Sequence, residues 1–180
     1  MTFQILTVCV GNVCRSPLME RLLRERLGSP AFGVSSAGIH GMVGSPMERS
    51  AAAQLIRLGG SPEGFAGRRI DTALITGSDL ILTATRAVRG EVLALAPGAM
   101  HRTFTLLELA AVVDSADELP SSPGDLVTWA ARHRSSAQGD LDIVDPIGRS
   151  AQIHRQAADL IDAGVASVVR ALLGQPRQVP

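Results

Sequence analysis

The sequence predicts a three-layer α/β/α sandwich built on a four-stranded parallel sheet. Short apolar runs alternate with amphipathic segments along the chain, a pattern typical of a parallel sheet covered by helices on both faces. The chain has 180 residues, of which 46% are hydrophobic, enough for one sizeable core. Because no repeat or long linker interrupts the pattern, we expect a single domain over residues 1–180, with a frayed tail from about residue 175.

Four apolar stretches are predicted to be strands. Residues 3–8 (FQILTV) and 32–37 (FGVSSA) are rich in β-branched or apolar side chains. Gly11 lies just past the first run and Gly38 directly follows the second. Residues 80–83 (LILT) follow a Gly-Ser turn and have the uniformly apolar character of a fully buried strand. Residues 102–105 predict a short fourth strand.

The first predicted helix begins at Ser16-Pro17, because serine is a favoured N-cap and proline is at home in the first turn. Its apolar stripe consists of Leu18, Met19, Leu22, Leu23 and Leu27. Its polar face consists of Glu20, Arg21, Arg24, Glu25 and Arg26. Gly28 is expected to end it.

Further helices are predicted over residues 47–58, 86–95, 106–113, 125–134 and 150–173. Ser45-Pro46 is expected to cap the first of these. Residues 114–125 and 135–149 have the composition of loops.

The overall charge and hydropathy exclude several classes of function. The formal net charge is zero, which gives no field suited to nucleic acid. No apolar run reaches about 18 residues and no basic segment precedes the first apolar run, so we expect neither a membrane span nor a signal peptide. With only two cysteines, we expect a cytoplasmic protein with free thiols. No pattern in the sequence determines the oligomeric state.

Both cysteines fall within CVGNVCRSP, between the first predicted strand and the first helix. Such a loop is a common ligand site in this type of fold. Gly11 and Asn12 tolerate positive φ, and backbone amides at a helix N-terminus attract anions. Arg15 adds a planar fork suited to two phosphate oxygens. The chemistry favours a tetrahedral oxyanion bound above a Cys9 thiolate.

Other interpretations of the cysteine pair start from the same residues. Cys9 at a strand end is also compatible with a buried apolar residue. A permanent Cys9–Cys14 disulfide conflicts with a reducing compartment. A zinc site lacks a nearby histidine in the sequence, so we expect no metal.

CVGNVCRSP resembles the signature of the low-molecular-weight protein tyrosine phosphatases, C-[LTV]-G-N-[IVT]-C-R-S-P. The resemblance continues in SSAG (residues 35–38), in DLILTATR (residues 79–86) and in Asp145-Pro146, ahead of the last predicted helix. It implies a cytoplasmic hydrolase of phosphoric monoesters that acts on phosphotyrosine in proteins and needs no cofactor.

The resemblance also implies roles for individual residues. Cys9 would be the nucleophile that forms a phosphocysteine, and Ser16 would donate a hydrogen bond to its sulfur. Asp145 would be the general acid and base, although Asp-Pro is also a common turn and Asp140 and Asp142 stand nearby. The phosphate would be bound by the loop residues Val10, Gly11, Asn12, Val13, Cys14 and Arg15.

Two supporting roles follow from the same resemblance. Asn12 and Ser36 would hold the phosphate loop in shape. Cys14 would be a redox guard that protects Cys9 from irreversible oxidation.

One departure from the family pattern concerns the substrate. Phosphotyrosine-specific relatives place aromatic rings after the second strand and after the Asp-Pro, whereas this chain has no Tyr and has Ile147 and Gly148 after Pro146. An aliphatic slot is expected from Val10, Met42, Val43 and Ile147. The expected partner is a phosphorylated protein, for which a tyrosine kinase is one candidate, and a non-tyrosine phospho-residue is the alternative substrate.

Two other functional classes are compatible with parts of the same sequence. Arsenate reductases that share the fold and loop use a thiol relay, but residues 15–180 contain no cysteine. That absence leaves only a route through a low-molecular-weight thiol. A non-catalytic phosphate-binding module is disfavoured, because both the nucleophile and the acid are present.

Overall fold

The computed structural model describes residues 2–176 and contains a four-stranded parallel sheet of order β2-β1-β3-β4. The strands are β1 (Phe3–Cys9), β2 (Phe32–Gly38), β3 (Leu80–Thr83) and β4 (Thr103–Thr105). In the register, Cys9 pairs with Gly38 and Val8 with Thr83, so the carboxyl ends of the three longest strands meet at one edge. The predicted sheet is confirmed.

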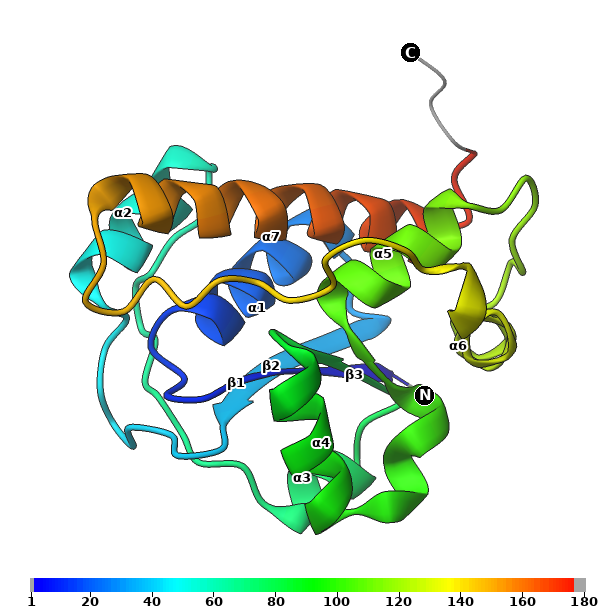
Figure 1. The fold of residues 1–180 in the computed structure, drawn as a ribbon, viewed down its shortest axis with the longest axis horizontal. Coiled ribbons are helices and arrows are strands. Elements are labelled where there is room, and N and C mark those ends of the chain that lie inside the picture. The colour runs from blue at the N-terminus through cyan, green and yellow to red at the C-terminus, as the bar shows by residue number, and fades with distance from the viewer. Residues whose placement is uncertain (1, 177–180) are drawn as a thin grey trace.

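Helices cover both faces of this sheet (Figure 1). One face carries α1 (Arg15–Leu27), α2 (Arg49–Arg57), α5 (Leu106–Asp114) and α7 (Ala151–Leu172), with α6 (Pro123–Arg132) at its side. The other face carries α3 (Thr72–Thr76) and α4 (Arg86–Leu95). Two short 3₁₀ helices, Pro97–Arg102 and Arg134–Ser136, complete the elements.

The strands divide their side chains between two cores. Ile5 points into the larger core under α1 and α7, whereas its neighbour Leu6 points into the smaller core under α3 and α4. Leu82 and Ile81 of β3 divide in the same way. This alternation follows from the two-residue period of a strand and gives the predicted three layers.

The predicted start of the first helix was wrong by a small margin. The helix begins at Arg15, with Cys14 as an N-cap that makes no side-chain capping bond. Ser16 lies inside the helix because its hydroxyl contacts the Cys9 sulfur rather than a backbone amide of the first turn. Gly28 ends the helix at a φ of 54°, as expected.

Two further predictions differ from the structure. The helix expected over residues 47–58 starts at Arg49, because the Glu48 carboxylate, not Ser45, caps it by accepting from the Ala51 amide. Glu20 was expected on the exposed face of the first helix, yet it is buried and bonded to Ser36 and Arg24.

The remaining helices agree with the prediction to within two residues, except for α3, which was not predicted because it has only five residues. No helix in the described part of the chain has the length and apolar character needed to cross a membrane. The expected frayed tail falls largely on residues 177–180, which lie outside the described residues.

Candidate active site

The loop between β1 and α1 presents its carbonyl groups outward. Backbone oxygens of Cys9, Val10, Gly11 and Val13 accept hydrogen bonds of 2.8 to 3.0 Å from the amides of Ile39, His40, Met42 and Glu48. In a planar trans peptide the N–H points opposite to the C=O. The amides that follow these carbonyls therefore face the interior of the loop, and form a cradle suited to an anion.

The Cys9 sulfur lies at the bottom of this cradle. The side chain is buried, and the sulfur accepts a hydrogen bond of 3.3 Å from the Asn12 amide. The Ser16 hydroxyl lies 2.9 Å from the same sulfur. An amide N–H and a hydroxyl group therefore contact the sulfur directly.

Asn12 holds the loop in its curled conformation. It has a φ of 53°, and it is the one non-glycine residue with positive φ among residues 2–176. Its Nδ2 donates to the hydroxyls of Ser16 and Ser36, both at 2.9 Å. Its Oδ1 accepts from the Arg68 amide at 2.8 Å. Asn12 and Ser36 therefore lie together, as the resemblance implied.

Glu20 and Arg68 complete this network, and the sequence analysis did not identify either. The Ser36 hydroxyl donates to the Glu20 carboxylate, while Arg68 Nε donates to the Ser36 carbonyl at 2.9 Å. Glu20, four residues after Ser16, is visible in the sequence. Its contact with Ser36 is evident only in the structure, where α1 packs against β2.

Arg15 links the loop to a distant segment of the chain. The guanidinium is only 5% exposed; its Nη1 donates to the Ile143 carbonyl at 3.0 Å and its Nη2 lies 2.8 Å from Asp145 Oδ2. Its Nε is buried and has no hydrogen-bond partner among the described residues. The Asp145 side chain is half exposed, so one end of the ion pair faces solvent.

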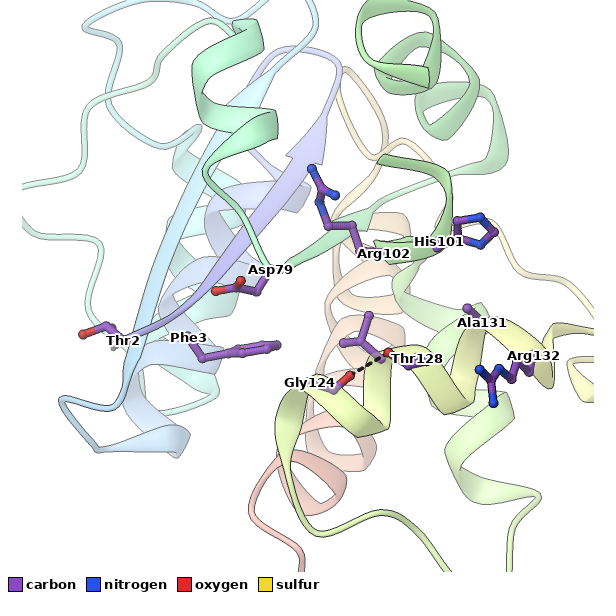
Figure 2. Close-up of a pocket in the computed structure, with 10 residues that line it drawn as sticks. Thr2, Phe3, Asp79, His101, Arg102, Gly124, Thr128, Ala131 and Arg132 are labelled. Atoms are coloured by element: carbon purple, nitrogen blue, oxygen red, sulfur yellow. Dashed lines mark hydrogen bonds between the residues drawn. The ribbon is translucent and has the colours of Figure 1, made fainter. Parts of the chain in front are cut away.

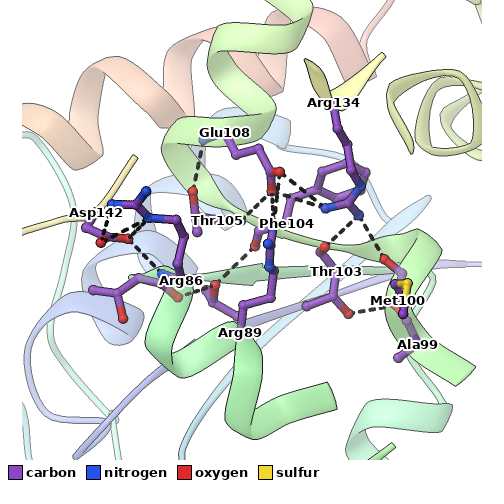
Figure 3. Close-up of polar contacts among 12 residues, drawn as sticks. Arg86, Arg89, Ala99, Met100, Thr103, Phe104, Thr105, Glu108, Arg134 and Asp142 are labelled. Atoms are coloured by element: carbon purple, nitrogen blue, oxygen red, sulfur yellow. Dashed lines mark hydrogen bonds and ion pairs between the residues drawn. The ribbon is translucent and has the colours of Figure 1, made fainter. Parts of the chain in front are cut away.

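Asp142 anchors the segment that carries Asp145 (Figure 3). Its carboxylate accepts from the Arg86 amide at 2.7 Å and from the Arg86 guanidinium at 3.0 to 3.3 Å. The hydrogen bonds from Arg86 lower the pKa of Asp142. Next to it, the Ile143 amide donates to the Ala84 carbonyl at 2.9 Å. Asp142 is thus hydrogen-bonded to Arg86, away from the phosphate loop, whereas Asp145 contacts Arg15 of that loop.

A buried carboxylate secures the start of the same segment. Glu108 on α5 pairs with Arg89 at 2.8 Å and with Arg134 at 3.2 Å (Figure 3). The Arg134 guanidinium also lies 3.9 Å from the centre of the Phe104 ring and donates to the Thr103 carbonyl at 2.8 Å. Burial lowers the pKa of Arg134. The sequence analysis did not identify this cluster, because its members come from separate elements.

Cys14 is a buried free thiol, as is Cys9. Burial and the negative charge of Glu48 raise the pKa of Cys14 to about 12. The thiol donates to Glu48 Oε2 at 3.8 Å. The redox-guard role stays a prediction.

The aliphatic residues named from the sequence are exposed beside the loop. Val10 belongs to the loop itself, and the Met42 amide donates to the Gly11 carbonyl. Val43 follows Met42, and Ile147 donates its amide to the Asp145 carboxylate. The exposed fractions are 40% for Val10, 54% for Met42, 74% for Val43 and 48% for Ile147. We call these four residues the aliphatic rim.

A separate pocket lies at the opposite edge of the sheet (Figure 2). It encloses about 730 Å³ and is lined by residues that begin or precede strands, including Phe3, Asp79 and Arg102, and by residues of α6. Since Cys9 stands at the other end of β1, this pocket is separate from the anion cradle.

Comparison with known proteins agrees with this geometry. A family model described as "Low molecular weight phosphotyrosine protein phosphatase" matches residues 4–121. The low molecular weight protein-tyrosine-phosphatase Etp of Escherichia coli K12 is 44% identical over 100 residues, which cover 56% of this chain and 66% of Etp. The chain thus matches just under two thirds of that relative. The family match ends before Asp145, so the position of Asp145 rests on the contacts described above.

Solved structures resemble the fold over nearly the whole chain. Wzb of Vibrio vulnificus in complex with benzylphosphonate is 26% identical, with a TM-score of 0.71 and coverage of 94% of this chain and 99% of Wzb. The YwlE arginine phosphatase of Geobacillus stearothermophilus is 25% identical, with a TM-score of 0.74 and coverage of 94% of this chain and 92% of YwlE. Fold, loop and family match agree, and the chain belongs to the low molecular weight phosphotyrosine protein phosphatase family.

Proposed function

We propose that the protein is a cysteine-dependent phosphatase that hydrolyses phosphomonoesters through a phosphocysteine on Cys9. The observation that carries the proposal is the cradle. Its amides face the loop interior, the Asn12 amide donates to the Cys9 sulfur, and the buried Arg15 guanidinium pairs with Asp145 at its side. Donors of this kind are suited to the three peripheral oxygens of a phosphoryl group in transfer.

In the first step the Cys9 thiolate attacks phosphorus, and a sulfur–phosphorus bond forms as the bond to the leaving oxygen breaks. Asp145 gives its proton to that oxygen. The Arg15 guanidinium, which lies 2.8 Å from Asp145, holds the acid beside the phosphoryl group. Arg15 Nε, which has no protein partner among the described residues, is available to a phosphoryl oxygen.

In the second step water attacks the phosphocysteine, Asp145 takes the proton of that water, and the sulfur–phosphorus bond breaks. Negative charge returns to the Cys9 sulfur. The Ser16 hydroxyl accepts from Asn12 Nδ2, and its own proton has two acceptors within reach, the Ala37 carbonyl at 3.3 Å and the sulfur at 2.9 Å. In this step the proton points at the sulfur, the nearer of the two. That hydrogen bond stabilises the departing thiolate.

The substrate is a phosphorylated side chain of a protein, and a tyrosine kinase is a candidate partner. The names of the relatives favour phosphotyrosine. The aliphatic rim offers Val10, Met42, Val43 and Ile147 but no aromatic ring to stack on a phenol. One structural relative is named an arginine phosphatase, and phosphoarginine is therefore the second candidate substrate.

The test is turnover of p-nitrophenyl phosphate by the purified chain and by its Cys9→Ser variant. Phosphatase activity that disappears in the variant supports the proposal, and equal activity in both proteins refutes it. Phosphotyrosine, phosphoarginine and phosphoserine peptides then rank the substrates. Arsenate reduction that requires an added small thiol, without phosphatase activity, would favour the reductase alternative.

A further inference from the structure

Three side chains with metal-binding chemistry converge beside the phosphate loop. They are Cys14, Glu48 and His154, and one donor atom from each lies within 4.8 Å of the other two. Cys14 is the N-cap of α1, Glu48 is the N-cap of α2, and His154 lies near the start of α7. Cys14 and His154 are buried, whereas Glu48 is partly exposed.

The spacing of the donors is close to that of a tetrahedral site. Glu48 Oε2 lies 3.8 Å from Cys14 Sγ and 3.7 Å from His154 Nδ1. Zinc bonds of about 2.3 Å to sulfur and about 2.0 Å to nitrogen or oxygen place tetrahedral donors roughly 3.3 to 3.5 Å apart. The two separations from Glu48 are therefore within a few tenths of an ångström of the tetrahedral spacing, and the remaining one, between Cys14 and His154, is below 4.8 Å.

We infer that Cys14, Glu48 and His154 form a binding site for one zinc ion, with a fourth position open to water. A thiolate and an imidazole favour zinc over calcium or magnesium, which prefer oxygen ligands. The thiolate and the carboxylate together carry two negative charges, which neutralise the dication. On binding, a sulfur–zinc bond replaces the Cys14 S–H bond and its proton passes to solvent.

Glu48 is already fixed in the orientation that such a site needs. The same oxygen, Oε2, accepts from the Ala51 amide at 2.9 Å and faces both Cys14 and His154. A ligand held by a second hydrogen bond loses little freedom when a metal binds. The sequence could not reveal this site, because the three residues come from three separate helix starts.

The experiment uses the full-length chain with Cys9→Ser, so that the proposed nucleophile cannot bind metal and the result does not depend on the proposed function. Cobalt(II) serves as a spectroscopic probe and zinc is measured by competition with a chromophoric chelator. We expect one equivalent of either metal and a thiolate-to-cobalt charge-transfer band in the near ultraviolet.

Variants in the same background identify the ligands. Cys14→Ser should abolish the charge-transfer band, and Glu48→Gln and His154→Gln should each weaken zinc binding by on the order of 100-fold. His101→Gln, an exposed residue of the opposite pocket (Figure 2), is the matched control and should bind as tightly as the parent. Should His154→Gln fail to fold, Cys14→Ser, a change of one atom, decides the question. The inference is overturned if the parent shows no thiolate band, or if Cys14→Ser leaves the band and the affinity unchanged.

Discussion

Replacing Asn12 with alanine tests how the phosphate loop is held. The side chain is fully buried and makes three hydrogen bonds, to Ser16, Ser36 and the Arg68 amide. Its backbone has a φ of 53°, which alanine adopts only with strain. Asn12→Ala therefore removes the bonds and adds strain, whereas Asn12→Gly removes the same bonds without the strain.

The expected loss in the free energy of unfolding follows from these contacts. Three hydrogen bonds at a net value of about 1 kcal/mol each give a loss of about 3 kcal/mol. The left-handed conformation adds about 1 to 2 kcal/mol for alanine. We expect the free energy of unfolding to fall by about 4 to 5 kcal/mol in Asn12→Ala and by about 3 kcal/mol in Asn12→Gly.

Urea unfolding of the three proteins at one pH measures both differences, and turnover of p-nitrophenyl phosphate measures the effect on the loop. We expect kcat to fall on the order of 100-fold in both variants, because a displaced cradle no longer holds the phosphoryl group in line. A loss of less than about 1 kcal/mol in Asn12→Ala, or a glycine variant no more stable than the alanine variant, would refute the reasoning.

Three further predictions concern the acid, the second cysteine and the clamp on the Asp145 segment. Asp145→Asn should lower kcat for phenyl phosphate on the order of 100-fold or more. The effect on p-nitrophenyl phosphate should be much smaller, because its leaving group needs no proton. Equal losses for the two substrates in steady-state assays would contradict the role of Asp145 as the acid. Because the pKa of Cys14 is raised to about 12, iodoacetamide near neutral pH should leave Cys14 unmodified in the Cys9→Ser variant, and peptide mapping that finds rapid alkylation of Cys14 would contradict this. The pKa of Asp142 is lowered by Arg86, so the clamp contributes stability above the ordinary Asp pKa and loses it as pH falls below about 4. The difference in Tm between the parent and Arg86→Gln should accordingly be present at neutral pH and vanish in acid, and a difference that persists at low pH would exclude the ion pair as its cause.

The sequence sufficed for the sheet and the cradle because their signals are local. Apolar runs bounded by turns predict strands, and the nine residues of CVGNVCRSP contain the strand end, the loop and the helix start in one segment. Cys9, Arg15 and Asn12 could therefore be identified without knowledge of any distant contact.

The family resemblance implied the Ser16–Cys9 and Asn12–Ser36 contacts, but the local pattern by itself did not, because tertiary structure overrides it. Serine is a favoured N-cap residue, but the Ser16 hydroxyl contacts Cys9 and Asn12 instead of capping the helix. Glu20 fits the polar face of an amphipathic helix, but β2 brings Ser36 against it and buries it.

The choice of Asp145 among the late acidic residues rested on a single feature of the sequence, to which the structure adds contacts. Asp140, Asp142 and Asp145 are close in the sequence, and only the Pro after Asp145 distinguished it. In the structure Asp142 is bonded to Arg86, whereas Asp145 pairs with Arg15 at the cradle.

The covalent intermediate is the most direct test of the central claim. The chain is mixed with p-nitrophenyl phosphate, quenched in acid within the first turnovers, digested and analysed by mass spectrometry. The mechanism predicts one phosphoryl group on the peptide that contains Cys9 and none on that peptide in Cys9→Ser. Turnover without any phosphorylated Cys9 peptide, or a phosphoryl group on another residue that forms as fast as product, would contradict it.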